Sequence, residues 1–127
     1  MGRKMEHELP LRGMRILVAE DEFLISVVLE DTLSEAGADT VCAATVRAAL
    51  RDAADEPLTA ALLDVRLGRQ TTEMVADALA AREIPFLFYS GQELPDKMRD
   101  KHPNAQLLLK PVTPCAVIDA LRKIAKH

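Results

Sequence analysis

The chain has 127 residues, the size of one domain, and its hydrophobic content of 49% is enough for a core. The aromatic content of 3% requires that core to be aliphatic, and the net charge of −4 argues against a nucleic-acid-binding protein, which normally carries a basic face. No apolar run approaches the roughly 20 residues that span a bilayer, and no apolar segment of a secretory signal follows the basic residues at the start, so we expect a cytoplasmic protein without membrane insertion.

The first 35 or so residues predict a lead-in, a strand and a helix. Residues 1–13 are mostly polar, so we expect a flexible lead-in there and a folded domain over residues 14–127. Residues 14–19 predict the first strand, which ends in three acids that suit the positive end of a helix dipole. The apolar face of the helix that follows is predicted to consist of Ile25, Val28, Leu29, Leu33 and Ala36.

The middle of the chain predicts two more strands and two helices. Residues 40–44 predict the second strand, and Thr45 is a plausible N-cap for a helix over 46–54. The apolar run 58–63 is short and uninterrupted, which favours a strand buried on both faces, and it ends on Asp64. Residues 65–70 are predicted to be a loop, after which Thr71 or Thr72 could cap the third helix.

The last third predicts two strands that end on polar residues. Residues 84–89 predict the fourth strand, followed by Ser90, and a short helix is expected over 95–101. Residues 105–109 predict the fifth strand, which ends on Lys110. Thr113 followed by Pro114 is a strong start signal for the last helix.

Five strands alternating with five helices predict an α/β fold, a doubly wound parallel sheet with helices on both faces. The functional candidates all follow strands: Glu20 and Asp21 after the first, Asp64, Ser90 and Lys110 after the third, fourth and fifth. In a sheet ordered 2-1-3-4-5 the first and third strands are neighbours, so the three carboxylates would cluster at one edge. Such an all-oxygen set suits Mg²⁺, which would offset the repulsion between the acids.

Each candidate also has a simple structural explanation. The acids could be an ordinary helix start, Asp64 a polar strand end, Ser90 part of a turn, and Lys110 a strand exit. The prediction rests on their occurrence together at four strand ends. Cys42 and Cys115 lie far apart in apolar surroundings, which predicts two reduced thiols and not a disulfide or metal site.

These strand ends resemble the receiver domain of two-component response regulators, the CheY-like family, over residues 14–126. The resemblance rests on the motifs Val18-Ala19-Glu20-Asp21-Glu22, Leu62-Leu63-Asp64, Tyr89-Ser90-Gly91 and Leu109-Lys110-Pro111. It implies a flavodoxin-like (βα)5 sheet that accepts a phosphoryl group from a histidine kinase, a histidine phosphotransfer protein or a small phosphodonor.

The resemblance implies a role for each residue. Asp64 would be the phosphoacceptor, and Glu20, Asp21, Asp64 and the backbone carbonyl of Arg66 would bind Mg²⁺. Physical chemistry agrees, since phosphoryl transfer needs a nucleophile, a metal and a further cation.

The remaining matches concern the switch. Ser90 would reach the phosphoryl group, Lys110 would pair with it, and Pro111 matches a proline that is usually cis. Many receivers carry an aromatic residue two positions before the lysine, where this chain has Leu108. The fourth strand resembles a Pro-Phe-x-Phe-Ala-Thr-Gly-like subgroup of single-domain receivers, but Tyr89 replaces the usual small residue, and we consider two hypotheses: its ring narrows access to Asp64, or it serves as a substitute switch.

We consider four functions for these residues. Because the chain ends just after the last helix, we expect a stand-alone switch that docks to a downstream protein when phosphorylated, and that catalyses only its own phosphorylation and dephosphorylation. A phosphate shuttle or sink between histidine kinases and a phosphotransfer protein is the alternative, and a non-switching scaffold is a third possibility. An Asp-nucleophile phosphatase of the haloacid dehalogenase type is disfavoured, since Arg66 stands where its second acid is required.

Overall fold

The structure, a computed structural model, describes residues 9–125 and contains a five-stranded parallel sheet in the order β2-β1-β3-β6-β7. The strands of this sheet are β1 (Arg15–Ala19), β2 (Asp39–Ala43), β3 (Ala60–Asp64), β6 (Phe86–Ser90) and β7 (Leu107–Leu109). The helices are α1 (Phe23–Glu35), α2 (Val46–Asp55), α3 (Glu73–Ala81), α4 (Asp96–Lys101) and α5 (Pro114–Ile124). The predicted α/β flavodoxin-like fold, with its 2-1-3-4-5 strand order, is confirmed.

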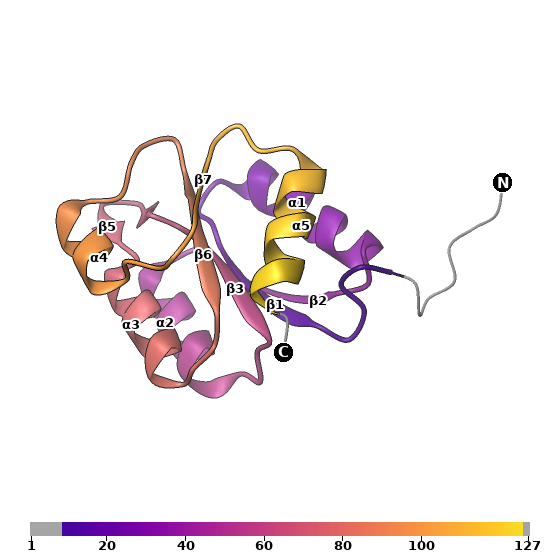
Figure 1. Ribbon diagram of the computed structural model, residues 1–127, viewed down its shortest axis with the longest axis horizontal. Coiled ribbons are helices and arrows are strands. Elements are labelled where there is room, and N and C mark those ends of the chain that lie inside the picture. The colour runs from indigo at the N-terminus through magenta and orange to yellow at the C-terminus, as the bar shows by residue number, and fades with distance from the viewer. Residues whose placement is uncertain (1–8, 126–127) are drawn as a thin grey trace, which may run out of the picture.

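Helices cover both faces of the sheet and make two core layers. Figure 1 shows α2 and α3 on one side and α1 and α5 on the other. All five residues of β3 are buried: Ala61 and Leu63 belong to the α2–α3 layer, and Ala60 and Leu62 to the α1–α5 layer. The uninterrupted apolar run therefore reflects a central strand with two buried faces, as predicted.

The starts of α2 and α5 follow the predicted caps, whereas the inner face of α1 is corrected. The hydroxyls of Thr45 and Thr113 each accept a backbone N–H three residues later, at 3.1 Å. In α1, Leu29 and Leu33 are buried, but Val28 is 59% exposed. The buried face of α1 is therefore narrower than the apolar face predicted from the spacing of its residues, and Val28 lies on the side of the helix that faces solvent.

The segment after β3 is not a plain loop. It contains a two-stranded antiparallel hairpin, β4 (Arg66–Leu67) and β5 (Gln70–Thr71), in which Leu67 is buried. Both cysteines are free, and they are exposed instead of lying in apolar surroundings. No helix within residues 9–125 has the length and apolar character needed to cross a membrane.

Part of the expected lead-in belongs to the core. Leu11 is 0% exposed, and its N–H donates to the carbonyl of Ala36 at 2.8 Å. Gly37 has φ +104°, and a Cβ there would lie 3.0 Å from backbone atoms of Arg12, so glycine lets this turn approach the end of α1. The domain therefore begins before residue 14, and residues 1–8 lie outside the described residues.

Leu11→Ala should destabilise the domain by about 2–4 kcal/mol, because it removes a fully buried side chain and leaves a cavity. Urea unfolding followed by circular dichroism measures the change. Leu24→Ala is the matched control: Leu24 is 77% exposed, so its loss should change stability by less than about 0.5 kcal/mol. Equal effects of the two substitutions would contradict the burial of Leu11.

Candidate functional site

Three carboxylates meet at the carboxyl edge of the sheet. Glu20 and Asp21 follow β1, and Asp64 ends β3, which pairs directly with β1 through Ala19 and Leu63. One oxygen from each of the three side chains lies within 4.8 Å of the others. Glu20 is almost completely buried and Asp21 is exposed, so the cluster opens to solvent on one side.

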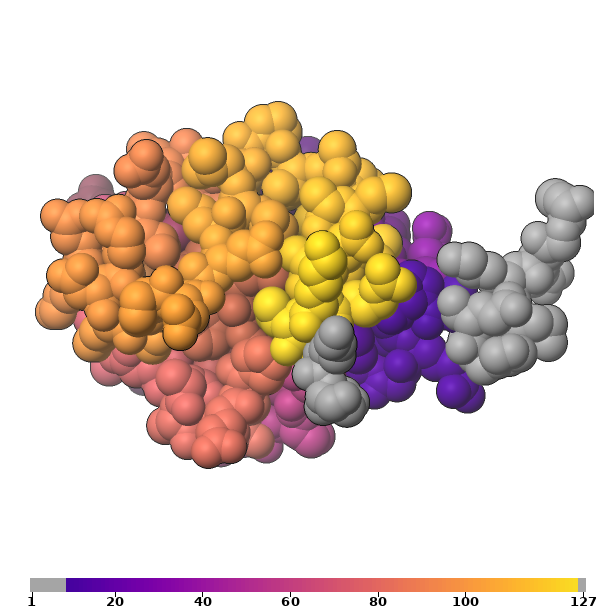
Figure 2. Space-filling model, viewed as in Figure 1, coloured from indigo at the N-terminus to yellow at the C-terminus, as the bar shows by residue number. Residues whose placement is uncertain are grey.

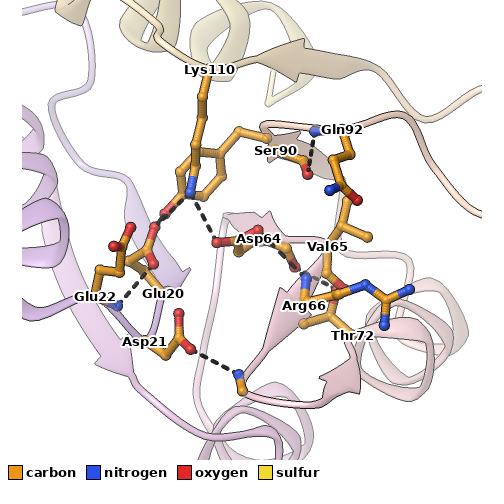
Figure 3. Close-up of polar contacts among 12 residues, drawn as sticks. Glu20, Asp21, Glu22, Asp64, Val65, Arg66, Thr72, Ser90, Gln92 and Lys110 are labelled. Carbon is orange, nitrogen blue, oxygen red and sulfur yellow. Dashed lines mark hydrogen bonds and ion pairs between the residues drawn. The ribbon is translucent and has the colours of Figure 1, made fainter.

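Lys110 supplies the positive charge within this cluster (Figure 3). It follows β7, and its peptide bond to Pro111 is cis. Its Nζ donates to Asp64 Oδ2 at 3.0 Å and to Glu20 Oε1 at 3.2 Å. The lysine therefore bridges two carboxylates that would otherwise repel each other.

Tyr89, which the sequence singled out as an unusual residue beside Ser90, makes a contact with Glu20 that the sequence did not reveal. Its hydroxyl donates to Glu20 Oε1 at 2.5 Å, and its ring lies below Lys110, with Nζ 4.6 Å from the ring centroid. Burial, followed by the hydrogen bond to Glu20, raises the pKa of Tyr89 far above its ordinary value, so the phenol stays a donor. The alternation of side chains between the two faces of a strand could have indicated that the Tyr89 side chain lies on the α1–α5 face of the sheet, because Leu87, two residues earlier in β6, lies on that face.

Backbone N–H groups fix the two acids of the first strand end. The N–H of Glu22 donates to Glu20 Oε2 at 2.9 Å, so both oxygens of Glu20 are engaged. The N–H of Gly68, in the turn of the hairpin, donates to Asp21 Oδ2 at 2.8 Å. Gly68 has φ +62°, a conformation that glycine adopts without strain.

The nucleophile candidate is anchored through its own backbone. The Thr72 hydroxyl donates to the carbonyl oxygen of Asp64 at 2.6 Å. The backbone N–H of Thr72 donates to the carbonyl oxygen of Val65 at 2.9 Å. Thr72 is the N-cap residue of α3, but its side chain does not cap the helix. The expected cap is therefore replaced by a contact that joins the start of α3 to the end of β3.

Ser90 lies at the same sheet edge without a hydrogen bond to Asp64 among the described residues. Ser90 is buried, and its Oγ accepts the N–H of Gln92 at 3.1 Å. Because the hydroxyl accepts in this contact, its own proton is free to be donated elsewhere. Arg66 donates its N–H to Asp64 Oδ1 at 3.5 Å, and the role of its carbonyl as a metal ligand stays a prediction.

The electrostatics favour a bound cation. Burial is the largest influence on the pKa of Asp64 and raises it, the hydrogen bond and charge of Lys110 lower it, and the charge of Glu20 raises it, so the pKa lies above its ordinary value. Burial tends to lower the pKa of Lys110, yet Asp64 and Glu20 raise it overall, so the lysine stays charged. An oxygen-only donor set with an exposed side fits Mg²⁺ and its water ligands.

No family model matches the chain. The chain is 27% identical over 129 residues to the sensory/regulatory protein RpfC of Xanthomonas campestris pv. campestris. This match covers 95% of the chain but only 18% of RpfC, so the chain corresponds to a small part of that protein.

Solved structures show the same fold. A CheY-like receiver domain protein from Methanospirillum hungatei JF-1 has a TM-score of 0.80 and 20% identity, over 88% of this chain and 93% of that one. The receiver domain of the sensor histidine kinase PA1611 from Pseudomonas aeruginosa PAO1 has a TM-score of 0.77 and 23% identity, over 89% and 98%. That structure has a magnesium ion coordinated in its active site cleft. The chain therefore has the fold of response regulator receiver domains.

Asp64→Asn should raise the melting temperature of the metal-free protein at pH 7. The pKa of Asp64 is higher in the folded than in the unfolded protein. At a pH between these two pKa values the unfolded protein binds fewer protons than the folded one, so the free energy of unfolding falls as the pH rises through this range. The substitution removes this cost, and the gain should vanish at acid pH, where Asp64 is protonated.

Differential scanning calorimetry in a chelating buffer measures the effect, with the exposed Asp100→Asn as control. Added Mg²⁺ should stabilise the wild type more than Asp64→Asn, because a ligand that binds the folded state stabilises it. A lower melting temperature for Asp64→Asn at pH 7 without metal would contradict this account.

Proposed function

We propose that the chain is a response regulator receiver domain that accepts a phosphoryl group on Asp64 and signals by phosphorylation-dependent docking to another protein. The observation that supports this most is the arrangement around Asp64: two further carboxylates within metal-binding distance, and Lys110 Nζ at 3.0 Å. The likeness of the fold to receiver domains agrees with it.

In the proposed reaction, an Asp64 carboxylate oxygen attacks the phosphorus of a phosphohistidine or of a small phosphodonor. A P–O bond to Asp64 forms, and the bond from phosphorus to the donor's nitrogen or oxygen breaks, its electron pair leaving with the donor. Mg²⁺, bound by Glu20, Asp21 and Asp64 and by the Arg66 carbonyl, would neutralise charge on the phosphoryl oxygens. Lys110 Nζ already lies 3.0 Å from Asp64 Oδ2, so its ammonium would be available to pair with the phosphoryl group.

Ser90 would report the phosphoryl group. Its hydroxyl proton is free in the described contacts, so it can turn and donate to a phosphoryl oxygen. Ser90 ends β6, and its carbonyl accepts the N–H of Lys110 at 2.7 Å, which links this movement to the loop after β7. The two hypotheses for Tyr89, restricted access and a substitute switch, stay predictions.

A groove beside the site suits the protein that carries the donor histidine. It has a volume of about 550 Å³ and is lined mostly by apolar residues of α1 and of the loop after β7: Leu24, Ile25, Val28, Leu29, Tyr89, Lys110, Pro111 and Val112. Phe23 and Leu24 are both 77% exposed at the start of α1. Because Lys110 lines the groove and also touches Asp64, a helix bound there would bring its histidine toward the phosphoacceptor.

The downstream protein would bind elsewhere, on the surface formed by α4, β7 and α5. The space-filling view shows α4 in orange and α5 in yellow on one face, with the region of β7 between them (Figure 2). Leu109 of β7 is exposed on this surface. Movement of Ser90 and Lys110 would reach it through the end of β7. The resemblance to the single-domain subgroup and the cytoplasmic location remain parts of this proposal.

A phosphate shuttle or sink is the second candidate function. The observation that favours it is that RpfC is a sensory/regulatory protein and that the PA1611 domain belongs to a sensor histidine kinase. In this second function the chain would pass its phosphoryl group on to a histidine instead of docking to a target. Rapid reverse transfer from phosphorylated Asp64 to a histidine phosphotransfer protein would favour this function over docking.

Incubation with Mg²⁺ and acetyl phosphate should add one phosphoryl group to the wild type, measured by intact mass. Asp64→Asn removes the nucleophile and should abolish the addition, as should chelation of the metal. Asp100→Asn, at an exposed position of α4, should be phosphorylated like the wild type. Equal phosphorylation of Asp64→Asn and wild type would rule out Asp64 as the acceptor.

Val28→Glu should slow phosphoryl transfer from the cognate kinase at least tenfold and leave acetyl phosphate labelling unchanged. Val28 is 59% exposed in the groove, so the substitution places a charge at the proposed interface without disturbing the core. Radiolabel transfer at several kinase concentrations measures the rate. Met74→Glu, an exposed position on α3, is the matched control, and equal slowing in both variants would place the kinase elsewhere.

A further inference from the structure

One oxygen of Glu20 is shared by two donors of different kinds. Oε1 accepts the hydroxyl of Tyr89 at 2.5 Å and the ammonium of Lys110 at 3.2 Å. The other oxygen, Oε2, accepts the backbone N–H of Glu22. The position of Oε1 therefore depends on Tyr89 and Lys110 together.

The two donors differ in how freely they can move. Lys110 is a flexible side chain that also binds Asp64, and under the proposed function it must turn toward the phosphoryl oxygens. Tyr89 is 1% exposed and belongs to the α1–α5 core layer. It pairs in register with Asp64 on one side and with Leu108 on the other, so its ring is held between neighbouring strands.

We propose that Tyr89 is a positioning residue for the metal site: its hydroxyl holds Glu20 in a metal-binding orientation and leaves Lys110 free to follow the phosphoryl group. The claim that Lys110 moves rests on the proposed function. The claim that Tyr89 orients Glu20 for metal binding rests only on the hydrogen bonds that Glu20 accepts from Tyr89 and Lys110. In this arrangement the ring of Tyr89 also supports the lysine from below.

Tyr89→Phe tests the hydroxyl while it keeps the ring and the packing. We expect about a tenfold higher dissociation constant for Mg²⁺, as is typical when a residue that orients a metal ligand is lost. Isothermal titration calorimetry measures it. Thr59→Val is the matched control, because it also removes a hydroxyl that bonds within the domain, to the N–H of Arg15, but at the opposite end of the sheet.

A spectroscopic measurement tests the contact directly. The chain has one tyrosine and no tryptophan, so near-ultraviolet tyrosine absorption reports on Tyr89 alone. A phenol that donates to a carboxylate absorbs at longer wavelength than one that donates to a neutral amide. Glu20→Gln should therefore shift the Tyr89 band to shorter wavelength, and an unchanged band would overturn the proposed contact.

A double-mutant cycle tests the sharing of Oε1. Tyr89→Phe should weaken Mg²⁺ binding more in a Lys110→Met background than in the wild type, since Glu20 then loses both donors. Additive effects, an unchanged affinity in Tyr89→Phe, or no Mg²⁺ binding by the folded wild type would overturn the inference. Failure of acetyl phosphate to label a wild type that shows the coupling would reject the proposed function alone.

Discussion

The repulsion between three carboxylates at one sheet edge is the constraint on which the rest of the site depends. Glu20 and Asp64 are buried, so their negative charges are poorly screened. Lys110 offsets part of this repulsion by touching both. The site is therefore built to bind positive charge. A metal ion would relieve the remaining repulsion, and under the proposed function it would also offset the charge of a phosphoryl group on Asp64.

The strand order produces this constraint. β1 and β3 are neighbours, so the residues that follow Ala19 and Leu63 must lie side by side even though they are far apart in the chain. Two apolar helical layers then fix the sheet, and the loops at its carboxyl edge carry the polar groups. The apolar core thus holds three mutually repelling carboxylates at the carboxyl edge of the sheet, and functional sites of α/β proteins commonly lie at this edge.

The fold and the main site positions could be predicted because they follow from local patterns and from topology. An apolar run that stops on Asp64 or Lys110 identifies a strand end without knowledge of side-chain packing. The contacts of Tyr89 and Thr72 could not be predicted, since each depends on which way one side chain turns in three dimensions. The burial of Leu11 was missed for a related reason: a single leucine in a polar segment shows no periodicity.

The contacts of Thr72 have a consequence for how this domain can vary. Asp64, Val65 and Thr72 are tied together by short hydrogen bonds, so the hairpin between them leaves and returns at a fixed point. Residues inserted into its turn would leave the end of β3 in place, but they would move the N–H of Gly68 away from Asp21. A change in the length of the hairpin would thus affect Asp21 and not the sheet, whereas a change at Thr72 would reach Asp64, the proposed phosphoacceptor, directly.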